Sequence, residues 1–479
     1  MKETLEPQTC ETSILMRLTH SPKSIPISAR TSPWRGALPF LLLAAACGGD
    51  GATAPDSKDP VLHQMLAAAG VTPISPPPAQ DPALVALGRT LMFDKILSGN
   101  RDISCSTCHD PVAHTSDGLS LSIGTGGVGA GPARALGTAR QFIPRNAPEL
   151  FNRGYPEFTS MFWDGRVARG ADGGLDTPAG AALPAGLSGP LAAQAMFPVF
   201  TRLEMRGHPG DLDRFGAPNE LAALGDDDPS PVWAALMSRL LAIDGYVTLF
   251  QAAYPGVPLD QLGFQHAANA IAAFETAAFA SSGSPFDDYL RGADDALSPA
   301  AKRGALLFFN NPGCVQCHRG PHLSDQKFHN IGVPQFGPGF GPAAPQDFGR
   351  GGVSGAAADH YLFRTPPLRN VELTGPWMHD GAYTTLTAAV RHYLDPHKSL
   401  TGFDAGGLRA ELRGTYLNDP ATLQAMLQTL DSTVREPAPL SDAQVDELVA
   451  FLRALTDPAT ADLGAVVPAS VPSGLPVGE

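Results

Sequence analysis

Cys105-Ser106-Thr107-Cys108-His109 and Cys314-Val315-Gln316-Cys317-His318 are the two stretches that decide the fold of this chain. Both have the form Cys-x-x-Cys-His, which is the attachment signature of c-type haem. Two thiols one helical turn apart can each add to one vinyl group of the porphyrin, and the adjacent His then reaches the iron from the same face. The sequence therefore predicts two covalently bound haem c groups, one at each stretch.

Other uses of paired cysteines explain the two stretches less well. A zinc ribbon needs further ligands, and a thioredoxin-like redox motif does not need a His after each pair. A disulfide framework would not repeat Cys-x-x-Cys-His. The two remaining cysteines, Cys10 and Cys47, lie in a leader segment. The repeated motif favours haem over all three alternatives.

The flanks of the two motifs also resemble each other. Residues 86–93 (ALGRTLMF) precede the first motif and residues 302–309 (KRGALLFF) precede the second, and both favour amphipathic helices. Ser298 and Pro299 suit the N-cap and first turn of the second helix. Ser441 and Gln444 form a capping-box pattern that starts a final helix. We expect a mainly α fold with two cytochrome c-like haem domains.

Composition helps to locate the expected domains and the segments that connect them. The chain contains 51 Gly and 46 Pro in 479 residues, which predicts long loops between short helices. We expect a leader over residues 1–47, a flexible tether over 48–80, an N-terminal haem domain over 81–292 and a C-terminal haem domain over 293–460. Residues 461–479 are expected to form a tail.

The N-terminus has the pattern of an export signal. Residues 37–46 (ALPFLLLAAA) form an apolar run behind several basic residues, too short to span a bilayer. Cys47 follows directly, which favours a lipoprotein cleavage site with Cys47 lipidated. Ordinary signal cleavage nearby is the alternative, and Met16 is a second candidate start. We expect a periplasmic protein, anchored to a membrane through Cys47. The net charge of −14 argues against nucleic acid as a partner.

The segment from Phe363 to Gly381 reads FRTPPLRNVELTGPWMHDG. It strongly resembles the bacterial dihaem cytochrome c peroxidase family, which includes the MauG-like enzymes. The same resemblance extends to LSG at 97–99, RNAP at 145–148, FWDGR at 162–166 and EM at 204–205. Together these segments cover most of residues 82–456 in the order found in the family.

The resemblance bears on the ligand opposite His318. Many family members place a Met fourteen residues after the His of the His-Asp-Gly motif, whereas MauG-like members place a Tyr there. In this chain that residue is Tyr393. Phenolate is a hard, anionic ligand that lowers the haem potential. Met378 or His392 is the alternative ligand if Tyr393 is only a core residue.

The first haem is expected to be open on one face. Many family members carry a removable His sixteen residues after the proximal His, and this chain has Thr125 at that position. His114 lies only five residues from His109 and is expected in a surface loop. The resemblance therefore implies a five-coordinate haem that is ready for peroxide.

The resemblance also implies the other site residues. Glu204 matches the distal acid that moves a proton during peroxide cleavage, and Gln194 resembles the MauG-like distal amide. Trp163 matches the aromatic residue between the two haems. Asn146, Thr374 and Pro376 match positions that hold a calcium ion through oxygen atoms.

These features imply an oxidoreductase that reduces hydrogen peroxide at the N-terminal haem. Its electrons would pass through the C-terminal haem from a small cytochrome c or a cupredoxin. Two alternatives remain: a MauG-like oxidase that modifies a protein partner, and an electron-transfer cytochrome without catalysis. Members of the family often form homodimers, which makes a dimer an expectation here too.

Overall fold

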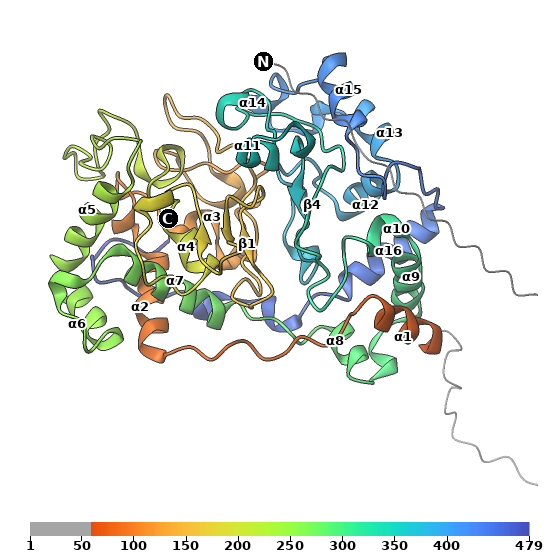
Figure 1. Cartoon of the computed structure of the whole chain (residues 1–479), viewed down its shortest axis with the longest axis horizontal. Helices are drawn as coiled ribbons and strands as arrows, with labels where there is room; N and C mark the ends of the chain where they lie inside the picture. Colours follow the sequence, from red (N-terminus) through yellow and green to blue (C-terminus); the bar gives the residue numbers. More distant parts are fainter. Residues whose placement is uncertain (1–58, 479) are drawn as a thin grey trace, which may run out of the picture. The chain divides into compact units, whose positions relative to one another are not determined.

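Two closely packed helix pairs form the framework of the fold, one for each Cys-x-x-Cys-His motif (Figure 1). The computed structural model describes residues 59–478. In the first pair, α2 (Pro82–Phe93) packs against α7 (Phe264–Ala278). In the second, α9 (Pro299–Asn310) packs against α16 (Asp442–Arg453). The predicted leader, Met16 and Cys47 lie outside the described residues.

A glycine makes each close approach possible. A Cβ atom on Gly88 of α2 would lie 1.8 Å from the carbonyl oxygen of Ala270 in α7. A Cβ atom on Gly304 of α9 would lie 1.8 Å from the carbonyl oxygen of Glu447 in α16. Real Cβ atoms do not come this near, so only glycine lets the two backbones meet. The two pairs are therefore built on the same contact.

The expected helix starts are confirmed. The Ser298 side chain accepts a hydrogen bond from the main-chain nitrogen of Ala301, with Pro299 in the first turn of α9. Ser441 and Gln444 form the expected capping box at the start of α16. Each cap satisfies main-chain donors that have no partner inside the helix.

Most of the other elements are short helices joined by loops, which confirms the mainly α prediction. The remaining α-helices are α1 (Asp59–Ala68), α3 (Cys105–Cys108), α4 (Pro190–Ala195), α5 (Ser230–Leu241), α6 (Asp244–Ala253), α8 (Pro285–Leu290), α10 (Pro312–Val315), α11 (Arg350–Ser354), α12 (Leu386–Leu394), α13 (Pro396–Thr401), α14 (Ala410–Arg413) and α15 (Pro420–Gln428). A π-helix spans Arg202–Arg206.

Strands are few among the described residues and form two small antiparallel sheets. The first has the order β1 (Ser160–Met161), β2 (Val167–Arg169), β3 (Leu175–Asp176), with Ser160 opposite Ala168. The second joins β4 (Phe328–His329) to β5 (Phe363–Arg364). The second sheet joins the segment that follows the second Cys-x-x-Cys-His motif to the start of the FRTPPLRN stretch.

Two hydrophobic cores surround the helix pairs. The core around α2 and α7 also buries Leu463, Val471 and Leu475 from the end of the chain. The core around α9 and α16 also buries Leu62 and Leu66 of α1. Figure 1 shows α1 beside α9. Both ends of the described chain therefore belong to cores.

The sequence predicts a flexible tether over residues 48–80 and a tail over residues 461–479, but the described parts of both segments pack into the fold. Residues 59–80 include helix α1, whose Asp59 is buried and binds Lys302 at 2.8 Å and the Tyr289 hydroxyl at 3.0 Å. Residues 461–478 run along α2, where Arg89 donates hydrogen bonds to the carbonyls of residues 465–467. Neither segment shows helical periodicity in the sequence, because its leucines are widely spaced among Gly and Pro. In the structure, burial of those leucines fixes both segments.

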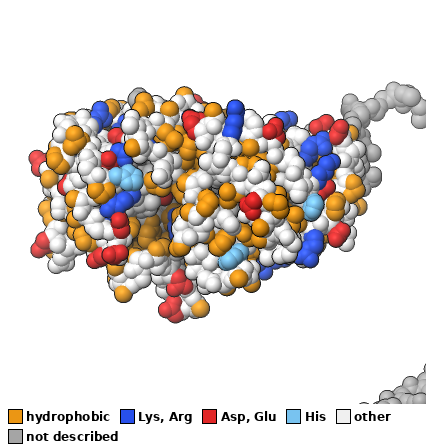
Figure 2. All heavy atoms as spheres, turned by 90° about the horizontal axis from the view of Figure 1, so that it is seen from above, with side chains coloured by type: hydrophobic (Ala, Val, Ile, Leu, Met, Phe, Trp, Pro, Cys, Tyr) orange, Lys and Arg blue, Asp and Glu red, His pale blue; other side chains and the backbone are white. Residues whose placement is uncertain are grey.

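Within residues 59–478, no single helix combines the length and apolar character needed to cross a bilayer, although the bent pair α5 and α6 meets that test when taken together. On the face shown in Figure 2, acidic and basic side chains are interspersed.

Candidate functional site

Each Cys-x-x-Cys-His motif opens onto a large cavity. The N-terminal cavity, beside Cys105, Cys108 and His109, has a volume of about 460 Å³. The C-terminal cavity, beside Cys314, Cys317 and His318, has a volume of about 140 Å³. Each motif thus faces a cavity on the side where a covalently attached cofactor would lie.

The attachment residues fit haem c in their chemistry. All four cysteines are free thiols, as thioether formation requires. His109 Nδ1 lies 3.2 Å from the carbonyl oxygen of Thr115, and His318 Nδ1 lies 2.9 Å from that of Leu323. A ring N–H that donates to a carbonyl leaves Nε2 free to bind a metal, which is the usual arrangement of ligating histidines. Burial lowers the pKa of His318 to about 4 and keeps the ring neutral.

The C-terminal cavity contains Tyr393, the expected second ligand. Tyr393 comes from α12, and its ring centroid lies 6.0 Å from that of His318 at an interplanar angle of 72°. Its hydroxyl forms no hydrogen bond with any residue that the structure describes. Burial raises the pKa of Tyr393, and the thiols of Cys317 and Cys314 raise it further. An unbonded phenol beside the proximal His is available as a ligand.

The two alternative ligands differ from each other. Met378 lines the C-terminal cavity. His392 is fully buried outside it, with Nδ1 2.8 Å from the Tyr383 hydroxyl and Nε2 2.8 Å from the Ile331 carbonyl. Both ring nitrogens of His392 are therefore occupied, and the geometry argues against His392.

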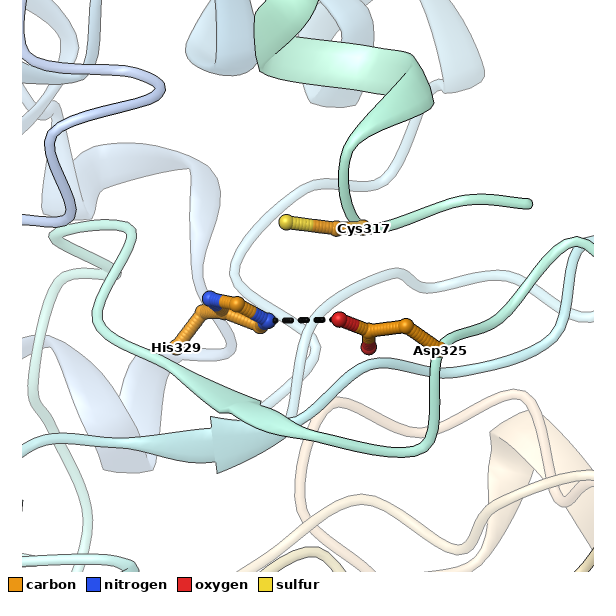
Figure 3. Close-up of side chains that lie close together, drawn as sticks. All are labelled: Cys317, Asp325 and His329. Carbon is orange, nitrogen blue, oxygen red and sulfur yellow. Dashed lines mark hydrogen bonds and ion pairs between the residues drawn. The ribbon is translucent and has the colours of Figure 1, made fainter. Parts of the chain in front are cut away.

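The walls of the C-terminal cavity are mainly apolar. They include Leu368, Val371, Leu386, Val390, Leu394, Leu448 and Leu452. One of the polar lining residues is His329, which lies near Cys317 and bonds to Asp325 at 3.1 Å (Figure 3) and to Asp431 at 2.7 Å. Hydrogen bonds to Asp325, Cys317 and Asp431 raise the pKa of His329 to about 11. Haem attachment would consume the Cys317 thiol, which leaves the His329–Asp325 hydrogen bond of Figure 3 beside the attachment cysteine and does not favour a metal centre there.

The N-terminal cavity carries two polar side chains expected from sequence. Glu204 lines it from the π-helix Arg202–Arg206, and Gln194 lines it from α4. Desolvation raises the pKa of Glu204, and the charge of Arg166 opposes that rise. A carboxyl can take up and return a proton during a reaction, and a raised pKa makes it a better proton acceptor.

Thr125 and His114 do not line the N-terminal cavity. The Thr125 hydroxyl donates to Asp102 at 2.7 Å, and its main-chain nitrogen donates to the Glu204 carbonyl at 2.8 Å. His114 is half-buried, with Nδ1 3.2 Å from the Thr460 carbonyl. Among the described residues lining this cavity, His109 is the one histidine. A second imidazole ligand is therefore not in place in this structure.

Trp163 lies between the two cavities and lines both. Its indole Nε1 donates to the Asn146 carbonyl at 2.9 Å. Arg364 also lines both cavities, and sequence reasoning missed it. Its guanidinium is buried, and this burial lowers its pKa to about 9. Because a buried cation needs an anionic partner, Arg364 is suited to an acidic edge of a cofactor.

The three positions expected around calcium have separate protein contacts. Asn146 is buried, with Nδ2 bonded to the Leu119 carbonyl at 2.7 Å and its main-chain nitrogen bonded to the His379 carbonyl at 2.8 Å. The Thr374 hydroxyl donates to the Val371 carbonyl at 3.4 Å. Pro376 is three residues from His379, so the Asn146 main chain approaches the segment that carries Pro376. The calcium site stays a prediction.

A buried ion-pair group beside Trp163 was also missed. Arg145 bonds to Asp347 through Nε at 2.7 Å and Nη2 at 2.8 Å, and to Asp164 through Nη1 at 2.6 Å. The resemblance contained Arg145 and Asp164, but Asp347 lies in a loop whose sequence carries no periodic signal.

Known proteins are similar to this chain over much of its length. The family model for di-haem cytochrome c peroxidases matches residues 82–295. A methylamine utilization protein MauG from Methylorubrum extorquens is 31% identical over 315 residues, which cover 65% of this chain and 69% of that protein. The cytochrome c551 peroxidase of Pseudomonas aeruginosa is 32% identical over 356 residues, which cover 74% of this chain and 84% of that protein.

Two solved structures share the fold. A MauG-like protein associated with microbial copper homeostasis aligns with a TM-score of 0.54 and 26% identity, covering 81% of this chain and 94% of its own. The diheme peroxidase BthA from Burkholderia thailandensis aligns with a TM-score of 0.54 and 24% identity, covering 81% of this chain and 90% of its own.

Proposed function

This chain belongs to the di-haem cytochrome c peroxidase family, and from that membership we propose that it reduces hydrogen peroxide to water at the N-terminal cavity. The family implies an oxidoreductase with two haem c groups, a peroxide substrate and a protein that donates electrons. The electrons would enter at the C-terminal haem. The donor would be a small cytochrome c or a cupredoxin.

The contrast between the two cavities carries this assignment. The N-terminal cavity places Glu204 and Gln194 among its lining residues and is the larger of the two. The C-terminal cavity is mainly apolar and already contains a side chain suited to the second ligand position, Tyr393. A cavity that contains a proton carrier suits a reaction, whereas a mainly apolar cavity with a protein side chain suited to the second ligand position suits electron transfer.

When bound, the haem groups supply peroxide coordination and one-electron redox chemistry. Glu204 would accept a proton from one peroxide oxygen and return it to the other, so that water becomes the leaving group. Gln194 would orient peroxide through its amide. His109 and His318 would each offer Nε2 to the iron, held in place by the carbonyls of Thr115 and Leu323.

Trp163 is proposed to relay electrons because its ring borders both cavities. The anionic oxygen of Tyr393 would favour the more oxidised states of its haem. Calcium at Asn146, Thr374 and Pro376 would brace this region. We further propose export to the periplasm, lipid anchoring at Cys47 and assembly as a homodimer.

Modification of a protein partner is the second candidate function. It is favoured by Tyr393 beside His318, together with the lack of a second histidine among the described residues lining the N-terminal cavity. With no second histidine among the described lining residues, a haem held by His109 would keep one face open to peroxide.

Peroxide-dependent oxidation of reduced cytochrome c by the purified holoprotein is the deciding experiment. Steady turnover that is lost in Glu204→Gln would support the peroxidase. Glu157→Gln is the matched control, because Glu157 is exposed and lies outside the cavity lining. Peroxide consumption without cytochrome c oxidation, accompanied by radicals on a protein partner, would favour the second candidate. No reaction with peroxide would leave a plain electron carrier.

A further inference from the structure

Because the two helix pairs meet at equivalent glycines, each residue of α7 can be matched with a residue of α16. Gly88 of α2 meets Ala270 and Phe274 of α7, and Gly304 of α9 meets Glu447 and Phe451 of α16. Counting one residue further in each helix pairs Ile271 with Leu448 and Glu275 with Leu452. All four side chains line the cavity of their own half. The repeated framework therefore places a carboxyl in the N-terminal cavity where the C-terminal cavity has a leucine.

Glu275 has the features of a functional group rather than a structural ion pair. Its side chain is 6% exposed, and the Oε2 atom is buried without a hydrogen-bond partner. Arg153 is the nearby charge, but its Nε and Nη2 bind Glu149, and its Nη1 is itself buried without a partner. A buried carboxyl without a bonded partner is costly when ionised.

We propose that Glu275 is a redox-linked proton site of the N-terminal haem, which releases a proton when that haem loses an electron and takes one up when the electron returns. In this exchange only the O–H bond of the Glu275 carboxyl breaks and forms. The proton passes to and from water, and the electron passes to and from the redox partner. The inference rests on haem attachment at Cys105 and Cys108 and is independent of peroxide turnover.

Proximity to the attachment cysteine supports this role. Glu275 raises the pKa of the Cys105 thiol electrostatically, second only to burial, so its carboxyl acts at the point where the porphyrin is attached. Positive charge gained by the haem on oxidation would stabilise the carboxylate, as any nearby cation does. Burial raises the pKa of Glu275 to about 8, partly offset by Arg153, so its proton is available near neutral pH.

The other charged groups around α7 are bound elsewhere. Arg89 of α2 donates to carbonyls of residues 465–467, and Arg239 of α5 pairs with Glu220. Helix α4 carries no charged residue. From the loop before β1, Arg153 and its partner Glu149 face the same cavity, as does Glu204 from the π-helix. Among the carboxyls that line this cavity, Glu204 and Glu149 are therefore the competing proton sites.

The test is a redox titration of the dihaem holoprotein at several pH values, resolved into two components. One component should become more negative as pH rises, approaching about 59 mV per tenfold fall in proton concentration for one proton per electron. Glu275→Gln should flatten that dependence and leave the other component unchanged. Glu157→Gln makes the same charge change outside the cavity and should leave both components as in the wild type.

Redox-difference infrared spectra provide a second readout. A carboxylic C=O band that changes with haem oxidation should vanish in Glu275→Gln and persist in Glu204→Gln and Glu157→Gln. Glu275→Leu, which copies Leu452, replaces Glu275→Gln if the glutamine variant binds fewer than two haems. An unchanged pH dependence together with an unchanged band would overturn the proposal. If the band is lost in Glu204→Gln and in no other variant, Glu204 is the proton site and the proposal for Glu275 is wrong.

Discussion

The main-chain nitrogen of Arg364 donates a 2.8 Å hydrogen bond to the carbonyl of Trp163, and the side chains of both residues line both cavities. This hydrogen bond joins two residues of the wall that the cavities share, although the motifs beside those cavities lie far apart in the sequence. The proposed electron path between the haems crosses this wall.

Replacing Trp163 tests that path. Trp163→Phe should slow peroxide-driven oxidation of cytochrome c by about tenfold or more, as expected for loss of a positioned group. Stopped-flow absorption at the two haems measures the transfer. The variant should also lose about 1 kcal/mol of unfolding free energy, because the Asn146 carbonyl loses its donor.

Trp233→Phe is the matched control for that variant. Trp233 is buried, and its indole donates to the Met196 carbonyl at 2.8 Å, but it lines neither cavity. Both variants should lose similar stability. Equal rates in the two variants would remove Trp163 from the electron path.

Replacing Tyr393 tests the ligand of the second haem. Tyr393→Met should raise the potential of the C-terminal haem by on the order of 0.1 V, within the ~0.8 V range that axial ligands span. A near-infrared charge-transfer band of Met-ligated haem should appear. Tyr383→Phe is the control, since the Tyr383 hydroxyl binds His392 and Ser399. A Met-type band already present in the wild type would contradict ligation by Tyr393.

Glu204→Gln should lower peroxide turnover by about 10²–10⁴-fold, the usual contribution of a positioned acid or base. The carboxylate is the form that accepts the proton, and desolvation raises the pKa of Glu204. Activity should therefore fall as pH decreases through that raised pKa. A pH–rate profile of both proteins measures this effect. An acid limb that persists in the variant belongs to another group.

The buried Arg145 group should govern stability in acid. Asp347→Asn leaves the Arg145 guanidinium underpaired and should cost about 3–5 kcal/mol in urea unfolding. Burial tends to raise the pKa of Asp347, but Arg145 outweighs it and the net pKa is lowered. The ion pair should therefore contribute fully above the ordinary Asp pKa of about 3.9 and be lost as pH falls through the lowered value.

Asp288→Asn serves as the control for the acid-stability experiment. Asp288 pairs with Arg291 at 3.2 Å, and both side chains are largely exposed. Such surface pairs contribute about 0–1 kcal/mol. If both variants lose a similar amount of unfolding free energy, the buried Arg145 ion pairs stabilise the fold no more than an exposed pair does.

Sequence reasoning reached the parts of the site that short motifs specify. Cys105, Cys108 and His109 needed only their spacing, and the cap at Ser298 needed only its own turn. Tyr393 and Glu204 came from a resemblance, and the structure places both in the expected cavities. Their chemical roles stay predictions.

Long-range contacts account for what was missed. Thr125 turns to Asp102 rather than to the cavity because of a hydrogen bond that only the folded chain forms. Glu275 is a charged residue, and a charged side chain is ordinarily expected at the surface, so the sequence alone offers no reason to place it in a cavity. Comparing α7 with α16 around Gly88 and Gly304 would have identified it.

The exchange of chain ends between the cores makes the two halves depend on each other. Leu463, Val471 and Leu475 complete the core around α2 and α7. Leu62 and Leu66 of α1 complete the core around α9 and α16. Each core therefore includes a segment that adjoins the other half in the sequence, and a cut between the halves should leave both cores incomplete.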